Sequence, residues 1–206
     1  DANTIGSQNT ALGKSALSEN TTASFNTAVG RQALLVNTTG ISNVAVGKDA
    51  LKSNTTASNN TAVGNNALEA NTTGNHNTSV GNNSLLSNTT GVYNVAVGSL
   101  TLDANTTANS NTGIGYAVLT SNETGAGNTA VGRDSLAANT TGSSNTAVGH
   151  DAGDSVTTGD NNTLIGRAAG AALTTGSNNI LLGHDAGLTG SPGGNRTIHS
   201  NKIGLG

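Results

Sequence analysis

The chain lacks several residue types that most folded domains use. Its 206 residues include no Cys, no Met, no Trp, one Pro and three aromatic residues, and only 9% of them are charged. Without Cys there can be no disulfide bonds and no thiolate metal sites. No run of apolar residues approaches the roughly 20 that a membrane helix needs. Eight Lys and Arg against eleven Asp and Glu leave no basic stripe for nucleic acid. We therefore expect neither membrane insertion nor nucleic-acid binding.

Three residue types dominate instead: 32 Thr, 31 Asn and 29 Gly make up 92 of the 206 residues. Leu, Ile, Val and Phe number only 39, a share that is typical of disordered chains. Disorder of that kind also needs a high net charge, whereas the formal net charge here is −3. The sequence contains no Gly-x-Ser-x-Gly elbow and no convergent pair of carboxylates. We therefore expect an ordered protein that is not an enzyme and has no cofactor.

A strict repeat organises these residues. Asn recurs every 17 residues from Asn9 to Asn179, and the eleven copies follow the pattern Asn-Thr-Ala-Val-Gly-x-x-Ala-Leu-x-x-Asn-Thr-Thr-Gly-x-x. Positions are numbered below from this first Asn. Position five is always Gly and is expected to turn the chain at positive φ. These structural turn glycines are Gly13, Gly30, Gly47, Gly64, Gly81, Gly98, Gly115, Gly132, Gly149, Gly166 and Gly183.

The repeat unit favours strands over helices. Thr, Asn and Gly are weak helix formers, and the β-branched residues at positions two and four suit one face of a strand. We predict an all-β fold, a parallel β-solenoid of eleven 17-residue coils with two or three short strands per coil. Val at position four and Leu at position nine are expected inside, and Asn at positions one and twelve in hydrogen-bonded ladders. Ala on the face opposite Val then suggests association along the rod, most simply as a homotrimer.

The copies divide the chain into three segments. Residues 1–149 hold the regular repeats and residues 150–190 hold variant ones, in which Leu at position nine becomes Gly153, Gly170 and Gly187. Asn at position twelve changes in the same copies to Val156, Leu173 and Gly190. We interpret these copies as a capping adaptation and residues 191–206 as a C-terminal cap or transition segment. Because Asp1 begins in the middle of the pattern, we expect the chain to be part of a longer protein.

The Asn-Thr-Ala-Val-Gly unit resembles the head repeats of trimeric autotransporter adhesins, which implies a left-handed β-roll. It resembles still more closely the repeat regions of phage and large-virus tail fibres. In those fibres, Asn-Thr-Ala-Val-Gly-x-x-Ala-Leu arrays precede an endosialidase-type intramolecular chaperone. The segment Asn178–Gly187, followed by Gly193-Gly194-Asn195 and residues 200–206, is similar to the sequence that leads into that chaperone.

Three groups of side chains are candidates for binding or modification. Phe25, His76, Tyr93 and Tyr116 are aromatic candidates for stacking on sugar rings. The Asn-x-Thr triplets are interpreted as β-turns carrying a Thr ladder, with N-glycosylation as the alternative; the candidate acceptors are Asn20, Asn37, Asn54, Asn71, Asn88, Asn105, Asn122 and Asn139. Charge gathers at positions six and seven, where we predict a mixed-charge ladder. His150-Asp151 and His184-Asp185 lie two coils apart, about 10 Å by the strand spacing, so no metal site is expected.

Three hypotheses for function follow. The first is a non-catalytic, extracellular rod of a viral tail fibre or surface adhesin, a homotrimer that holds a receptor-binding tip at a distance and contacts host-surface glycans. The second is the subunit of an extracellular filament, N-glycosylated and assembled head to tail through unpaired strand edges. The third is an ice-binding solenoid with one exposed Thr row from positions thirteen and fourteen.

Overall fold

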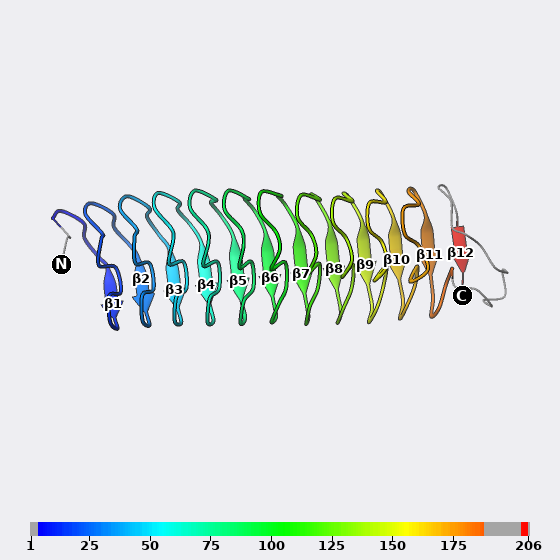
Figure 1. Cartoon of the computed structure of the whole chain (residues 1–206), viewed down its shortest axis with the longest axis horizontal. Helices are drawn as coiled ribbons and strands as arrows, with labels where there is room; N and C mark the ends of the chain where they lie inside the picture. Colours follow the sequence, from blue (N-terminus) through cyan, green and yellow to red (C-terminus); the bar gives the residue numbers. More distant parts are fainter. Residues whose placement is uncertain (1–3, 188–202, 206) are drawn as a thin grey trace.

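The computed structural model describes residues 4–187 and 203–205, and these residues form one rod with a single parallel sheet along its length (Figure 1). The sheet has 12 strands in sequence order. The strands are β1 (Thr10–Leu12), β2 (Thr27–Val29), β3 (Val44–Val46), β4 (Thr61–Val63), β5 (Thr78–Val80), β6 (Val95–Val97), β7 (Thr112–Ile114), β8 (Thr129–Val131), β9 (Thr146–Val148), β10 (Thr163–Ile165), β11 (Ile180–Leu182) and β12 (Ile203–Leu205).

The strands β1 to β11 pair without any slip in register. Each residue lies beside the residue 17 positions away, as Ala28 lies beside Ala45, so every copy of the repeat is one coil of a β-solenoid. This confirms the predicted architecture. β12 comes from the segment predicted to cap the chain and pairs in parallel with β11, Ile180 beside Ile203. The other residues of that segment lie outside the described ones.

Each coil between residues 4 and 187 contains one strand, not the predicted two or three. The Asn-Thr-Thr segment does form hydrogen bonds to the next coil, but several of its donors share one carbonyl instead of each pairing with a different one as in a strand. The main-chain amides of Thr38 and Thr39 both donate to the carbonyl of Thr55, at 2.9 and 3.3 Å, and the Thr38 hydroxyl donates to the same oxygen at 3.1 Å. Because three donors share one acceptor, no strand ladder forms here.

Left-handed backbone closes each coil between residues 9 and 178 at four places, positions five, seven, nine and seventeen. The glycines at position five have φ between 111° and 141°, as expected. Leu at position nine is less expected, because a left-handed conformation costs an L-residue about 1–2 kcal/mol. Leu85, for example, has φ 48° and is fully buried, so burial of its side chain offsets that cost. Gly153 and Gly170 keep the left-handed turn at φ 61° and 72°.

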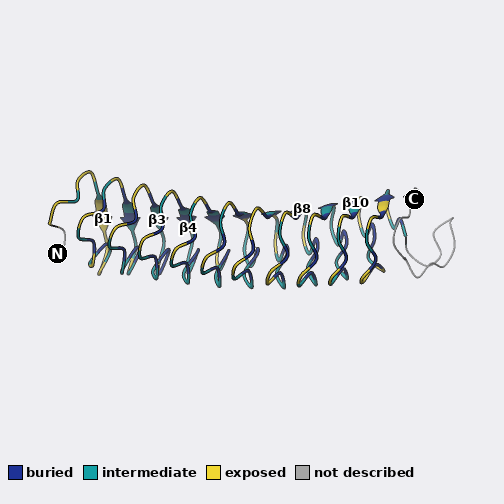
Figure 2. Ribbon diagram, turned by 90° about the horizontal axis from the view of Figure 1, so that it is seen from above, coloured by how far each residue is buried: buried dark blue, intermediate teal, exposed yellow. Residues whose placement is uncertain are grey.

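The interior is lined by positions three, eight and nine, and Figure 2 shows buried residues recurring at the same places along the rod. In β6, Ala96 is fully buried whereas Val97 is 36% exposed. The strand alternates as predicted, but the predicted orientation is wrong: the Val side chains face outward and the Ala side chain faces the interior. The physical reason is space, because a 17-residue coil leaves room for Ala opposite a buried Leu and for little more. The predicted outward Ala row, which was the argument for a homotrimer, does not exist.

The variant coils lack Leu at position nine but have larger apolar side chains at other interior positions. Leu164 replaces Ala at position three and is fully buried, as are Val156 and Leu173 in place of Asn at position twelve. A Cβ added to Gly153 would lie 2.5 Å from Leu164 Cδ1, and one added to Gly170 would lie 2.8 Å from Leu164 Cδ2. Leu164 therefore occupies the space that Leu at position nine fills elsewhere, so the loss of that Leu leaves no cavity.

The two predicted Asn ladders are present and buried. At position one, the main-chain amide of Asn43 donates to Asn26 Oδ1 at 2.9 Å, and Asn43 Nδ2 donates to the carbonyl of Ala57 at 2.8 Å. At position twelve, Asn54 Nδ2 donates to Asn37 Oδ1 at 2.9 Å and to the same Ala57 carbonyl at 3.0 Å. The ladders thus satisfy main-chain groups that the narrow coil would otherwise bury unpaired.

Candidate functional site

The exposed aromatic residues do not form one site. His76 and Tyr93, both at position seventeen, stack on adjacent coils with ring centroids 5.1 Å apart and an angle of 11° between their planes. Phe25 occupies the same position three coils from His76, and Tyr116 lies at position six, on another edge. All four side chains are exposed. The structure therefore offers a two-ring aromatic platform, with two isolated rings elsewhere on the rod.

The predicted N-glycosylation acceptors are the buried position-twelve ladder. All eight Asn side chains are at most 1% exposed. Their Nδ2 atoms, which would carry the glycan, each donate to the carbonyl at position fifteen at 2.9–3.2 Å. A glycan at any of them is incompatible with the folded coil, because it would remove this bond and could not fit inside. The triplet instead has the structural role of a turn, and its first Thr donates to the next coil.

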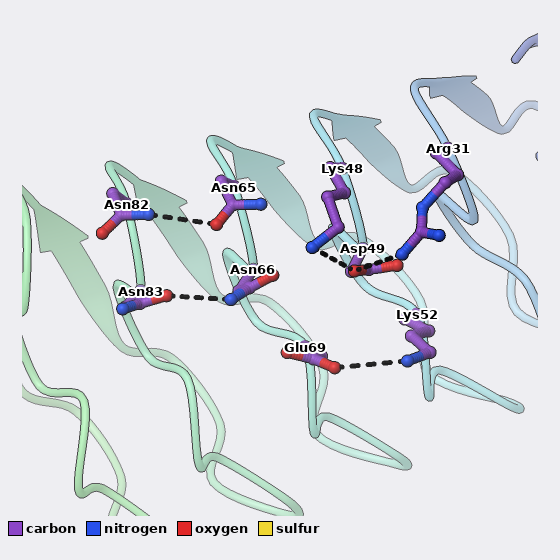
Figure 3. Close-up of polar contacts among 9 residues, drawn as sticks. All are labelled: Arg31, Lys48, Asp49, Lys52, Asn65, Asn66, Glu69, Asn82 and Asn83. Carbon is purple, nitrogen blue, oxygen red and sulfur yellow. Dashed lines mark hydrogen bonds and ion pairs between the residues drawn. The ribbon is translucent and has the colours of Figure 1, made fainter.

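Positions six and seven form an edge of the rod, here called the charged edge, that begins directly after the strands. Asp49 Oδ2 lies 3.2 Å from Lys48 Nζ and 3.6 Å from Arg31 Nη2, so one carboxylate is neutralised by two cations (Figure 3). Further along, Asn66 Nδ2 donates to Asn83 Oδ1 at 3.1 Å. The ion pairs of Asp49 have the form of the predicted mixed-charge ladder.

One group on the charged edge was not anticipated from the sequence. Asp134, His150 and Asp151 each offer one metal-ligating atom, and these atoms lie within 4.8 Å of one another. His150 Nδ1 is 3.0 Å from Asp151 Oδ2. The two His-Asp pairs are two coils apart, whereas Asp134 and Asp151 are 17 residues apart and therefore stacked. That spacing was the signal that could have revealed the group.

Asp154 lies near this group and has a perturbed carboxyl. Burial raises the pKa of Asp154 above its ordinary value of 3.8, and the negative charges of Asp151 and Asp134 add to the effect. Ser155 opposes it by donating a hydrogen bond to Asp154 Oδ1 at 3.3 Å. The carboxylates in coils eight and nine therefore repel one another in the folded protein.

Because the folded-state pKa of Asp154 is raised, ionisation of this group destabilises the fold. The penalty is absent below the unfolded-state pKa and fully present above the folded-state pKa. We expect Asp154→Asn, which keeps the oxygen that accepts from Ser155, to raise the free energy of unfolding at pH 7 by about 0.5 kcal/mol, the scale of screened surface charges. At pH 3 the substitution should have almost no effect. Urea unfolding at the two pH values measures this, and an equal gain at both would contradict it.

The outer face of the sheet is a stripe without charge, here called the sheet stripe and formed by positions two and four of all eleven coils. Position two holds Thr, Val or Ile and position four holds Val, Ile or Leu, so none of these 22 side chains is charged. Every one of them is half-buried or exposed. Val44, Val95 and Ile180 interrupt the Thr row at position two, so this face is a mixed apolar surface and not a continuous hydroxyl array.

Within the described ranges, no helix has the length and hydropathy to cross a membrane. Comparisons with protein-family models, with curated proteins and with solved structures gave no match.

Proposed function

We propose that the chain is a structural and adhesive rod, a non-catalytic part of an extracellular viral tail fibre or surface adhesin. The observation that supports this is the uninterrupted stack of coils between residues 4 and 187, in which the strands β1 to β11 stay in register and the Asn ladder at position one runs through to Asn179. Such a stack holds its two ends far apart, and each coil depends on its neighbours for stability. Glycan contact in this proposal falls to the His76–Tyr93 platform, since aromatic rings present apolar faces.

Copies of the chain would associate in parallel through the sheet stripe, which replaces the Ala face of the sequence prediction. The stripe is free of charge over its whole length, and Val63, Val97, Ile114, Val148 and Ile165 are each 36–42% exposed along it. A partner of matching periodicity is needed to cover it evenly, and a second copy of this chain has that periodicity. The number three in this proposal comes from the resemblance to trimeric adhesin heads and tail fibres.

The oligomeric state tests this proposal. We expect sedimentation equilibrium to give a three-chain species for the wild type and a folded monomer for the double variant Val63→Lys, Val131→Lys, here called the stripe variant. Both side chains lie on the outer face, so the lysines should leave the coils intact. The matched control is Thr39→Lys with Thr107→Lys. Both residues occupy position fourteen of the repeat, where they are exposed and lie outside the stripe, so this variant should stay trimeric. A wild type that is monomeric and folded at tens of micromolar would contradict the association.

The alternative is a subunit of an extracellular filament, in which successive chains would stack head to tail as the coils of one chain do. Electron microscopy of the same samples separates the two proposals: rods of one length support the fibre, and fibres that lengthen with concentration support the filament. The glycosylated form of the filament is no longer proposed, because the acceptor residues are buried.

A further inference from the structure

We propose that Asp134, His150 and Asp151 form a binding site for a divalent transition-metal ion such as Zn²⁺. The three side chains follow β8 and β9 on the charged edge, one turn beyond Gly132 and Gly149. They supply one imidazole nitrogen and two carboxylate oxygens within 4.8 Å of one another. Zn²⁺ accepts this mixed donor set and binds such atoms at about 2.0–2.2 Å, so small rotations of three half-buried side chains would close the site around it.

The backbone holds the three residues in place before any ion arrives. Asp134 and Asp151 are both left-handed, at φ 54° and 59°, which Asp tolerates better than most residues. The main-chain amide of Asp151 donates to the carbonyl of Arg133 at 3.0 Å, and that of Asp134 donates to the carbonyl of Tyr116 at 3.0 Å. The main chain of the two residues is therefore held one above the other, on neighbouring coils, by the register of the stack itself.

The charges around the group favour a cation. Directly stacked like charges on neighbouring strands are destabilising, and Asp154 adds a third carboxylate that feels the other two. Arg133 Nε donates to Asp134 Oδ2 at 2.8 Å, so one positive charge faces three negative ones. Asp49, the acid at the same position in coil three, is by contrast enclosed by two cations. Coils eight and nine are the described coils that have acids at position seven in succession.

The chain contains its own control two coils further on. Arg133-Asp134 and His150-Asp151 are matched there by Arg167-Ala168 and His184-Asp185. The single change of ligand type is Ala168 in place of Asp134. In this second group Arg167 Nη1 lies 2.9 Å from His184 Nε2. In the first group Arg133 instead donates to the neighbouring Asp134. The second group therefore lacks one ligand of the proposed site and holds an arginine against the imidazole.

Isothermal titration of the metal-free full chain, without a His-tag, with zinc chloride tests the proposal. We expect one saturable Zn²⁺ per chain for the wild type, and at least about a tenfold loss of affinity in Asp134→Asn, since even outer-shell changes cost that much. Asn should preserve the fold, because Asn66 and Asn83 occupy the same left-handed position. Circular dichroism and the unfolding midpoint of each variant verify this.

Ala168→Asp is the sharper test, because it should create a second site by supplying the missing ligand. We expect two Zn²⁺ per chain in this variant, and one again when Asp185→Asn is added to it. Asp185→Asn in the wild type is the matched control and should leave the first site unchanged. A wild type that binds no Zn²⁺ up to millimolar concentration, or an Asp134→Asn variant that binds as tightly as the wild type, would overturn the proposal.

Discussion

Replacing Gly81 with alanine should cost at least about 3 kcal/mol of stability, because two effects add at this position. Its φ of 141° belongs to a region that only glycine occupies readily, and other residues there cost about 1–3 kcal/mol. The new Cβ would also lie 2.6 Å from the carbonyl carbon of Gly98 and closer still to its oxygen. Both atoms are main chain, so the clash is relieved only if coils five and six move apart.

That separation predicts a particular form of unfolding. Since each coil is stabilised by its neighbours, a break between coils five and six should divide the stack into two shorter ones. We expect urea unfolding of Gly81→Ala, followed by circular dichroism, to begin at lower urea and to show two transitions where the wild type shows one. A single transition at the wild-type midpoint would contradict the close approach of the coils.

Gly127→Ala is the matched control for this experiment. Gly127 also has positive φ, 69°, but the nearest atom to an added Cβ, Ser144 Oγ, is 3.7 Å away. Non-glycine residues such as Asn59 and Asn161 occupy the same position of the repeat with φ 61° and 56°. Alanine at position 127 should therefore cost no more than about 1–2 kcal/mol, the price of a left-handed L-residue, and should leave unfolding in one step.

The sequence was sufficient for the features that depend on periodicity. A spacing of 17 residues without insertion predicts equivalent coils, and equivalent coils place Asn over Asn and Gly over Gly, as the structure confirms for Asn43 above Asn26 and for Gly81 beside Gly98. The stacking of Asp134 and Asp151 follows from the same arithmetic. The expectation of no metal site rested on the two His-Asp pairs, which are two coils apart, and not on acids in consecutive copies.

The sequence was not sufficient to decide which face is inside. Alternation along Val95-Ala96-Val97 separates Ala96 from its neighbours but does not say which side faces the core. Hydrophobicity favours Val inside, whereas the width of the coil, which depends on the left-handed turns at positions seven, nine and seventeen, leaves room for little more than Ala where Leu at position nine is buried opposite. Those turns are made largely by Leu, Asp and Asn, and the intrinsic preference of Leu gives no hint of them. The sequons have the same limitation, since a motif carries no information on burial, and the sequence left glycosylation and a structural turn as alternatives.

The inverted assignment of the faces can be tested by truncating one residue of each kind. Leu85 is fully buried, and Leu85→Ala should lower the free energy of unfolding by about 3 kcal/mol, within the usual range for a buried Leu that leaves a cavity. Val97 is 36% exposed on the sheet stripe. Val97→Ala removes two methyl groups that are partly solvated, so it should cost less than about 1 kcal/mol.

Association through the sheet stripe would blur this comparison, because a partner would bury Val97. Both substitutions are therefore best made in the stripe variant, which is expected to be monomeric, and compared by urea unfolding at equal protein concentration. In that background the two losses should differ by about 2 kcal/mol, with Leu85→Ala the larger. In the unmodified chain Val97→Ala should cost more than in the stripe variant, and this extra cost should fall as the protein is diluted and the copies dissociate. Equal losses in the stripe variant would mean that Val97 packs in the interior, and the assignment of core rows and stripe would then be reversed.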